Sequence, residues 1–125
     1  MTDVDIATVL AIHEEVIAFA GGSTGLRDHG LLEAAVAAPF QTFSGEDLFP
    51  TLHDKAARLA FGIIKNRPFV DGNKRTGAAV MGIFLEVNGI LLSFSQRELI
   101  DIITSVADGS AGYEELSAWI RAHVV

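Results

Sequence analysis

Cysteine is absent from this 125-residue sequence, and basic residues are scarce. Without cysteine the chain can form neither a disulfide framework nor a thiolate metal site. The 9 lysines and arginines stand against 16 aspartates and glutamates, which gives a net charge of -7. Because affinity for a nucleic-acid backbone depends on many basic side chains, this balance argues against a general nucleic-acid-binding protein. Any phosphate-binding site must therefore be local.

Long hydrophobic runs are also missing. No apolar segment approaches the roughly 20 residues that are needed to cross a bilayer, so we expect no membrane association. The first residues, Met1 to Asp5, are acidic where a secretory or transit peptide would be basic. We therefore expect a soluble, cytoplasmic protein.

Half of the residues are hydrophobic, which in a chain of this length is enough for one domain, residues 1–125, with one core. Helical spacing of apolar residues runs through most of the sequence. It predicts an all-α bundle of about six helices, near residues 6–20, 28–38, 51–66, 74–88, 95–106 and 113–125. The segment 74–88 is apolar or small on every side, which is typical of a helix surrounded by other helices. We expect it to be the buried central helix.

Residues 39–50 interrupt the helical pattern and predict a loop or small hairpin. This segment places three phenylalanines, Phe40, Phe43 and Phe49, between two prolines. The aromatic side chains either plug the core or form a flap on which a substrate protein docks. The sequence leaves both interpretations open.

Two further features near the N-terminus have structural interpretations. His13 falls on the apolar stripe of the first helix, which favours a packed, hydrogen-bonded histidine over a catalytic one. The segment from Gly21 to Gly25 is glycine-rich, but it follows a helix and lacks the spacing of nucleotide-binding loops. It is therefore interpreted as a helix end and turn.

The chemistry is expected where the central helix begins. A helix N-terminus presents unpaired backbone N–H groups and the positive end of the helix dipole, so it attracts anions. At this point Gly72 permits close approach of the backbone, Asn73 can cap the helix, and Lys74 and Arg75 add positive charge. Asp71 supplies a carboxylate, the ligand that Mg²⁺ prefers. The pattern predicts a site for a polyphosphate and magnesium, although each residue alone is also typical of an ordinary turn or a solvated surface.

The segment from Pro68 to Arg75 resembles the motif of the Fic/death-on-curing family. In that motif His-Pro-Phe-x-Asp/Glu-Gly-Asn-Gly/Lys-Arg leads into a central helix, and eight consecutive positions of this chain agree with it. The segments Leu10–Glu14, Gly25–Glu33 and Gly82–Gly89 also look like death-on-curing toxins. The resemblance therefore covers nearly the whole chain and implies a Fic-like helical bundle.

The resemblance implies a role for each residue of the motif. Asp71 would be the magnesium ligand, Gly72 and Asn73 would form the anion-binding loop, and Arg75 would clamp a nucleotide phosphate. Phe69 would anchor the loop in the core.

Lys74 stands where adenylylating Fic proteins have glycine, and a lysine here is similar to the death-on-curing branch. That branch resembles a protein kinase in outcome, since it transfers the terminal phosphate of ATP to a threonine of elongation factor Tu and stops translation. A lysine beside the phosphates would crowd the pose used for AMP transfer and would stabilise a transferred phosphoryl group by its charge. We therefore expect a kinase-like toxin that uses ATP and Mg²⁺, with AMP transfer to a protein hydroxyl as the alternative.

Arg67 departs from the family pattern, because it occupies the position of the histidine that acts as general base. An arginine guanidinium stays protonated and has no acceptor lone pair, so it cannot take the proton from a target hydroxyl. Loss of a general base typically removes about 10²- to 10⁴-fold of the rate, and we expect this chain to be inactive or nearly so.

Three explanations of the arginine remain open: a natural pseudoenzyme that still binds nucleotide or a partner, an arginine used in another way, and an inactivating substitution. The third is favoured because every other motif position is intact and an active toxin would kill the cell that makes it. Another histidine is not expected to replace the base. His53 lies about four helical turns upstream of the loop, and the sequence does not place His29 or His123.

The sequence lacks the inhibitory Ser/Thr-x-x-x-Glu-Gly/Asn helix that some Fic proteins carry. The resemblance therefore implies a separate antitoxin, a protein whose C-terminal segment folds into a helix when it binds in a groove of the toxin.

Overall fold

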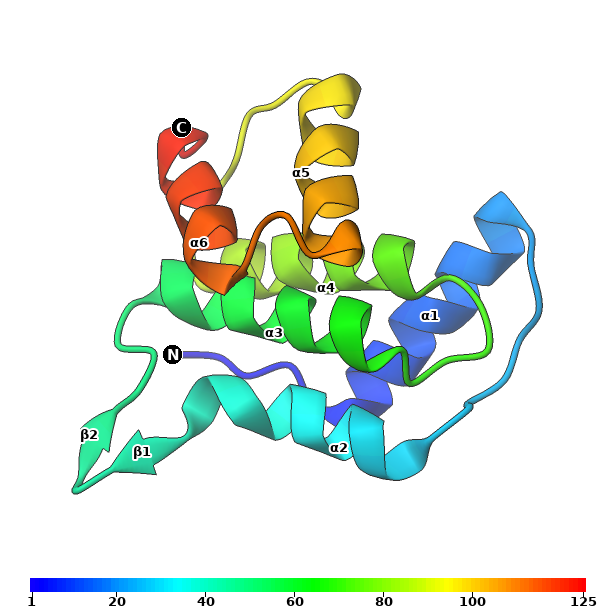
Figure 1. Ribbon diagram of the computed structural model, residues 1–125, viewed down its shortest axis with the longest axis horizontal. Coiled ribbons are helices and arrows are strands. Elements are labelled where there is room, and N and C mark those ends of the chain that lie inside the picture. The colour runs from blue at the N-terminus through cyan, green and yellow to red at the C-terminus, as the bar shows by residue number, and fades with distance from the viewer.

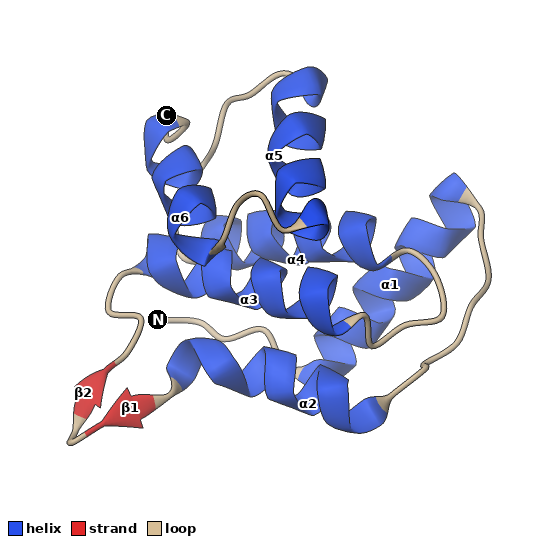
Figure 2. Ribbon diagram, in the orientation of Figure 1, coloured by secondary structure: helices blue, strands red, loops and turns tan.

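The computed structural model describes all residues, 1–125, and is almost entirely helical (Figures 1 and 2). The elements in chain order are α1 (Ile6–Ala20), α2 (His29–Ala37), the short 3₁₀ turn η1 (Ala38–Phe40), β1 (Thr42–Phe43), β2 (Glu46–Asp47), α3 (Leu52–Asn66), α4 (Asn73–Val87), α5 (Gln96–Asp108) and α6 (Tyr113–Ala122). The predicted all-α bundle of about six helices is confirmed. No helix combines the length and the apolar composition that would be needed to span a membrane.

Helices α3 and α4 lie side by side at the centre, with α2 on one side of them, α5 and α6 on the other, and α1 against α4 (Figure 1). The close packing of α3 on α4 depends on Gly77, since a Cβ atom there would lie 2.8 Å from the Ile64 side chain. Four large apolar residues of α4 are fully buried: Val80, Met81, Phe84 and Leu85. The predicted central helix is thus present, and α3 shares the core with it.

Local capping signals set most of the helix ends. The carboxylate of Asp28 accepts a hydrogen bond from the amide of Leu31 at 3.0 Å and begins α2. Ser95 and Glu98 form the predicted capping box at the start of α5. The prediction was wrong at the C-terminus, where α6 ends at Ala122 instead of continuing to the last residue. Beyond Ala122, Val124 forms an isolated antiparallel bridge with Leu92.

The predicted hairpin is present as the two short antiparallel strands β1 and β2. Phe40 packs edge-on against Phe84, and Phe49 packs edge-on against Tyr113. Phe43 is 73% exposed. Phe40 therefore packs against the core, Phe49 is half-buried against Tyr113, and Phe43 is the most exposed of the three.

His123 connects the end of α6 with the start of α5. Its Nδ1 lies 2.6 Å from the carbonyl oxygen of Trp119, and its Nε2 lies 2.9 Å from a carboxylate oxygen of Glu98. A carbonyl and an ionised carboxylate only accept hydrogen bonds, so these two partners favour the protonated imidazole, in which both ring nitrogens donate. The bond to the Trp119 carbonyl, followed by that to Glu98, raises the pKa of His123 above its usual 6.5. Hydrogen bonds from the Ser95 amide and from His123 lower the pKa of Glu98 to about 2.

These shifts predict how stability depends on pH. His123 binds its proton more tightly in the folded chain. Its contribution to the free energy of unfolding is therefore complete below pH 6.5 and is lost as the pH rises through the raised pKa. The contribution of Glu98 is present above pH 4.5 and is lost as the pH falls toward about 2. Between about pH 6 and 9 we expect the Tm, followed by circular dichroism, to fall more steeply in the parent chain than in His123→Gln. Equal slopes for the two chains would contradict this account of His123.

Candidate active site

The motif loop begins at an unusual backbone position. Arg67 ends α3 in the left-handed conformation, with φ of 51°, and its amide donates to the carbonyl of Ile63 at 3.2 Å. Helices commonly end in this conformation, but glycine usually occupies it, because other residues pay a steric penalty there. The loop therefore holds a large cationic side chain at a strained position directly beside the predicted phosphate site.

The connection between α1 and α2 is paired to this loop along its length. Leu26 forms an isolated antiparallel bridge with Phe69, and the amide of Val70 donates to the carbonyl of Gly25 at 3.1 Å. The amide of Arg27 donates to the carbonyl of Pro68 at 2.7 Å. Residues 25–28 thus form a strap that fixes the backbone of residues 66–70.

Asn73 does not cap α4 as predicted; Gly72 occupies the N-cap position in the left-handed conformation, and no side chain caps the helix. The Asn73 amide side chain turns back to Phe69 instead: its Oδ1 accepts from the Phe69 amide, and its Nδ2 donates to the Phe69 carbonyl, both at 3.0 Å. The loop has to reverse direction within a few residues, and this buried side chain satisfies the two backbone groups inside the reversal. The first-turn amides of α4 consequently have no side-chain partner and remain available to an anion.

Phe69 lies in the core, 1% exposed, and stacks on the ring of His13 with centroids 3.8 Å apart. His13 is itself buried, as expected, and its Nε2 lies 2.9 Å from the carbonyl oxygen of Asp71. Because a carbonyl only accepts, Nε2 carries the proton. His13 therefore has a structural role: from α1 it holds the backbone of the motif loop.

The carboxylate of Asp71 is held by two backbone amides. Its Oδ1 accepts from Gly72 at 2.9 Å and its Oδ2 from Ser23 at 3.2 Å. A Cβ atom at Gly22 would lie 2.7 Å from Oδ2, and Gly22 has a φ of +117°, so only glycine fits there. The glycine-rich turn after α1 thus leaves room for this carboxylate, whose two oxygens can accept further hydrogen bonds beside these two.

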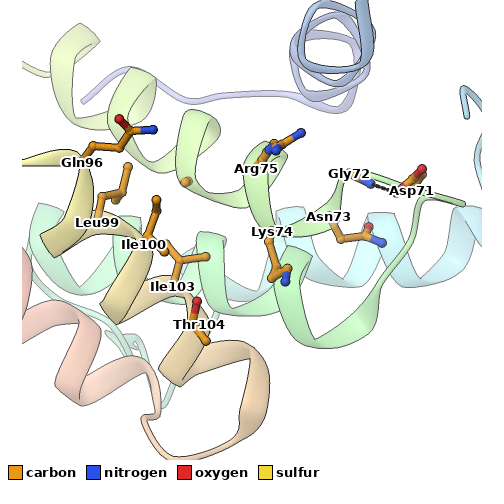
Figure 3. A pocket seen from close by; sticks show the side chains of 11 residues that line it. Asp71, Gly72, Asn73, Lys74, Arg75, Gln96, Leu99, Ile100, Ile103 and Thr104 are labelled. Carbon is orange, nitrogen blue, oxygen red and sulfur yellow. Dashed lines mark hydrogen bonds between the residues drawn. The ribbon is translucent and has the colours of Figure 1, made fainter. Parts of the chain in front are cut away.

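Next to this loop lies a cleft of about 530 Å³ between the start of α4 and one face of α5 (Figure 3). One wall holds all five of the predicted binding residues, Asp71, Gly72, Asn73, Lys74 and Arg75, and the other holds Gln96, Leu99, Ile100, Ile103 and Thr104. The cleft therefore combines a cationic, amide-rich end with an apolar wall, an arrangement that suits a ligand with a phosphate end and a flat or apolar end.

Arg67 lies beside the cleft rather than in it. It borders a smaller hollow of about 320 Å³ that also touches Asp71, Gly72 and Lys74. The structure thus brings together Arg67, Asp71, Lys74 and Arg75 around the same loop. His29, His53 and His123 border neither hollow. His29 pairs with Glu33 in its own helix at 3.0 Å.

The hairpin segment with the three predicted docking phenylalanines lies at the opposite end of the molecule from the motif loop (Figure 1). It precedes the N-terminus of α3, whereas the motif loop follows the C-terminus of α3. A helix of 15 residues is about 22 Å long. A substrate docked on Phe43 would have to extend along α3 to reach the cleft, and the docking role remains a prediction.

Sequence reasoning missed three parts of the site: the α5 wall, the strap residue Arg27, and the amide of Ser23. The apolar residues of α5 look like ordinary core positions, and Arg27 looks like a charged loop residue. The glycine-rich turn was the one signal available for Ser23, since two adjacent glycines indicate that the backbone passes close to something.

Comparison with known proteins shows the family of this chain. The family model described as "Fic/DOC family" matches residues 3–85. The chain is 42% identical to "Toxin Doc" of Mycolicibacterium smegmatis over 104 residues, which are 82% of this chain and 79% of that protein. It is 26% identical to "Protein kinase doc" of Escherichia phage P1 over 113 residues, or 90% of this chain and 88% of that protein. The chain belongs to the Fic/DOC family.

Proposed function

We propose that this chain is a death-on-curing type toxin built to transfer the γ-phosphoryl group of ATP to a threonine of elongation factor Tu, and that it is inactive as written because of Arg67. The observation that carries the proposal is the uncapped start of α4, where amides, Lys74 and Arg75 face a cleft of about 530 Å³. The names of its relatives, "Toxin Doc" and "Protein kinase doc", support toxicity and phosphoryl transfer.

ATP and Mg²⁺ fit the residues of this site. The chain has no group of three or more histidine or acidic side chains that could enclose a metal by itself. Mg²⁺ usually keeps several waters and is bound by one or two carboxylates together with substrate phosphates, which is what the single carboxylate of Asp71 beside an anion site offers. When bound, the metal would neutralise charge on the phosphates.

The remaining residues would bind and orient. The α4 amides and Arg75 would hold phosphate oxygens, and Lys74 would stabilise the charge on the transferred group. The threonine hydroxyl would attack the γ-phosphorus while the bond to ADP breaks, and the hydroxyl proton would pass to a base at position 67. Histidine at 67 could accept this proton, whereas Arg67 cannot. This reaction would take place in the cytoplasm, where both substrates are found.

A separate antitoxin is the proposed partner. An apolar groove of about 550 Å³ continues from the cleft along α4 to the link before α5, and 8 of its 11 lining residues are hydrophobic. Arg75, Ala78 and Leu99 border both the groove and the cleft. An amphipathic antitoxin helix lying in this groove would therefore reach the phosphate site.

Two alternative functions have different observable outcomes. An adenylyltransferase would move the α-phosphate of ATP with its AMP, and a non-catalytic binding module would move neither. Lys74 favours the kinase, because it lines the cleft and its charge would stabilise a transferred phosphoryl group.

The position of a radioactive label tests the proposed reaction. We expect purified Arg67→His protein to transfer label from γ-labelled ATP to elongation factor Tu and none from α-labelled ATP. The chain with Arg67 serves as the control and should transfer neither label. Transfer from the α position would support adenylylation, and no transfer of either label by Arg67→His would support the binding module.

A further inference from the structure

The side chain of Arg27 binds the end of α3 at the residue where the catalytic base would be. Its Nε donates to the carbonyl of Arg67 at 2.7 Å, and its Nη2 donates to the carbonyl of Asn66 at 2.8 Å. The backbone amide of Arg27 donates to the next carbonyl, that of Pro68, at 2.7 Å. One residue from the strap therefore satisfies three consecutive carbonyls of the motif loop.

We propose that Arg27 is a positioning residue for the transfer reaction, an inference that rests on the proposed function. It would hold residue 67 in the left-handed conformation that directs its side chain toward the hollow beside the phosphates. The last carbonyls of a helix have no partners within the helix and carry the negative end of its dipole, so a guanidinium suits them in geometry and in charge. Its planar fork reaches two carbonyls at once, which a lysine ammonium on a single flexible stem does not reproduce.

The anion-binding half of the loop is held by other residues. Asn73 fixes both backbone groups of Phe69, and His13 binds the carbonyl of Asp71. The amide of Ser23 holds the Asp71 carboxylate. Removing the Arg27 side chain should therefore disturb residue 67 and leave the phosphate-binding residues in place.

Arg27 itself is not placed to touch a nucleotide. It borders neither the main cleft nor the smaller hollow, and two of its side-chain nitrogens already donate to backbone carbonyls. Its effect on the reaction should therefore appear in the rate of the chemical step rather than in nucleotide affinity.

Arg121 supplies a matched control, because it binds the opposite end of α3. Its Nη2 donates to the Thr51 hydroxyl at 2.8 Å, and its Nη1 donates to the Ser117 hydroxyl at 3.1 Å. Both arginines thus support the same helix by side-chain hydrogen bonds, and only Arg27 touches the motif loop.

The test compares Arg27→Met, Arg27→Lys and Arg121→Met in protein that also carries Arg67→His. We expect Arg27→Met to lower kcat by about 10- to 100-fold, since small misplacements of a reacting group have effects of this size. The KM for ATP should change by less than about twofold, because the residues that would bind ATP equally in the ground state and the transition state are unchanged. Arg27→Lys keeps the charge and should recover only part of kcat, and Arg121→Met should leave kcat nearly unchanged even if it lowers the Tm. Unchanged kcat in Arg27→Met, a rise in KM alone, or an equal loss in Arg121→Met would overturn the proposal.

Hydrogen exchange in the chain with Arg67 gives a second measurement that needs no activity. In Arg27→Met the amide of Arg67, which donates to Ile63, should exchange faster by about 10-fold or more, and the amide of Thr76, which donates to Gly72, should not change. Equal protection of the Arg67 amide in both chains would refute the positioning role. If Arg67→His transfers no phosphate at all, the proposed function fails, and this exchange measurement alone decides whether Arg27 fixes residue 67.

Discussion

Replacing Arg67 with histidine is expected to raise the rate of phosphoryl transfer by about 10²- to 10⁴-fold, because it restores a group that can accept the proton of the target hydroxyl. ATP affinity should change little, since Asp71, Lys74 and Arg75 are the same in both chains. The measurement is single-turnover transfer to elongation factor Tu, with ATP binding followed by calorimetry. Growth arrest on induction of Arg67→His in cells gives an independent readout.

Arg67→Gln is the control for this gain. It removes the positive charge without supplying a base, so it separates relief of a misplaced cation from restoration of proton transfer. We expect Arg67→Gln to bind ATP and to remain inactive. A rate for Arg67→Gln equal to that of Arg67→His would show that position 67 needs only the absence of arginine, and the base would then have to lie elsewhere.

The second large effect concerns stability. Phe69→Ala is expected to lower the free energy of unfolding by about 3–5 kcal/mol, the usual cost of truncating a fully buried aromatic side chain. Phe69 is 1% exposed, stacks on His13, and bonds through its backbone to Asn73, so few neighbours can move into the space it leaves. Urea unfolding followed by circular dichroism measures the change.

Phe43→Ala is the matched control, since it makes the same chemical change at a side chain that is 73% exposed. Surface substitutions of this kind usually change stability by no more than about 0.5 kcal/mol. A loss of less than about 1 kcal/mol in Phe69→Ala would mean that the motif loop is not anchored in the core. A similar loss in both variants would mean that the hairpin packs more tightly than its exposure indicates.

The helices could be predicted because their signals are local. Asp28 and the Ser95–Glu98 pair lie within a few residues of the amides they cap, and the apolar spacing repeats within each helix. The buried α4 could be predicted for the same reason. Such features need no knowledge of which segment packs on which.

The parts of the site that sequence reasoning missed depend on distant contacts. Arg27 and Arg67 are 40 residues apart in sequence, and Ser23 and Asp71 are 48 apart. Asn73 is a different case, because a capping role follows from local statistics and the structure overrules it. The loop closes on itself there, and the side chain satisfies the buried backbone of Phe69 instead of the first turn of α4.

The left-handed conformation of residue 67 has a consequence for gene dosage. Arginine and histidine are both unbranched at Cβ, so each can occupy this backbone position, and exchanging them should leave the fold and the groove along α4 unchanged. Under the proposed function, an inert copy with Arg67 would still bind antitoxin as tightly as a working copy with histidine. A cell that holds both would have less free antitoxin to restrain the working copy, so the inert copy would lower the amount of active toxin needed to arrest growth.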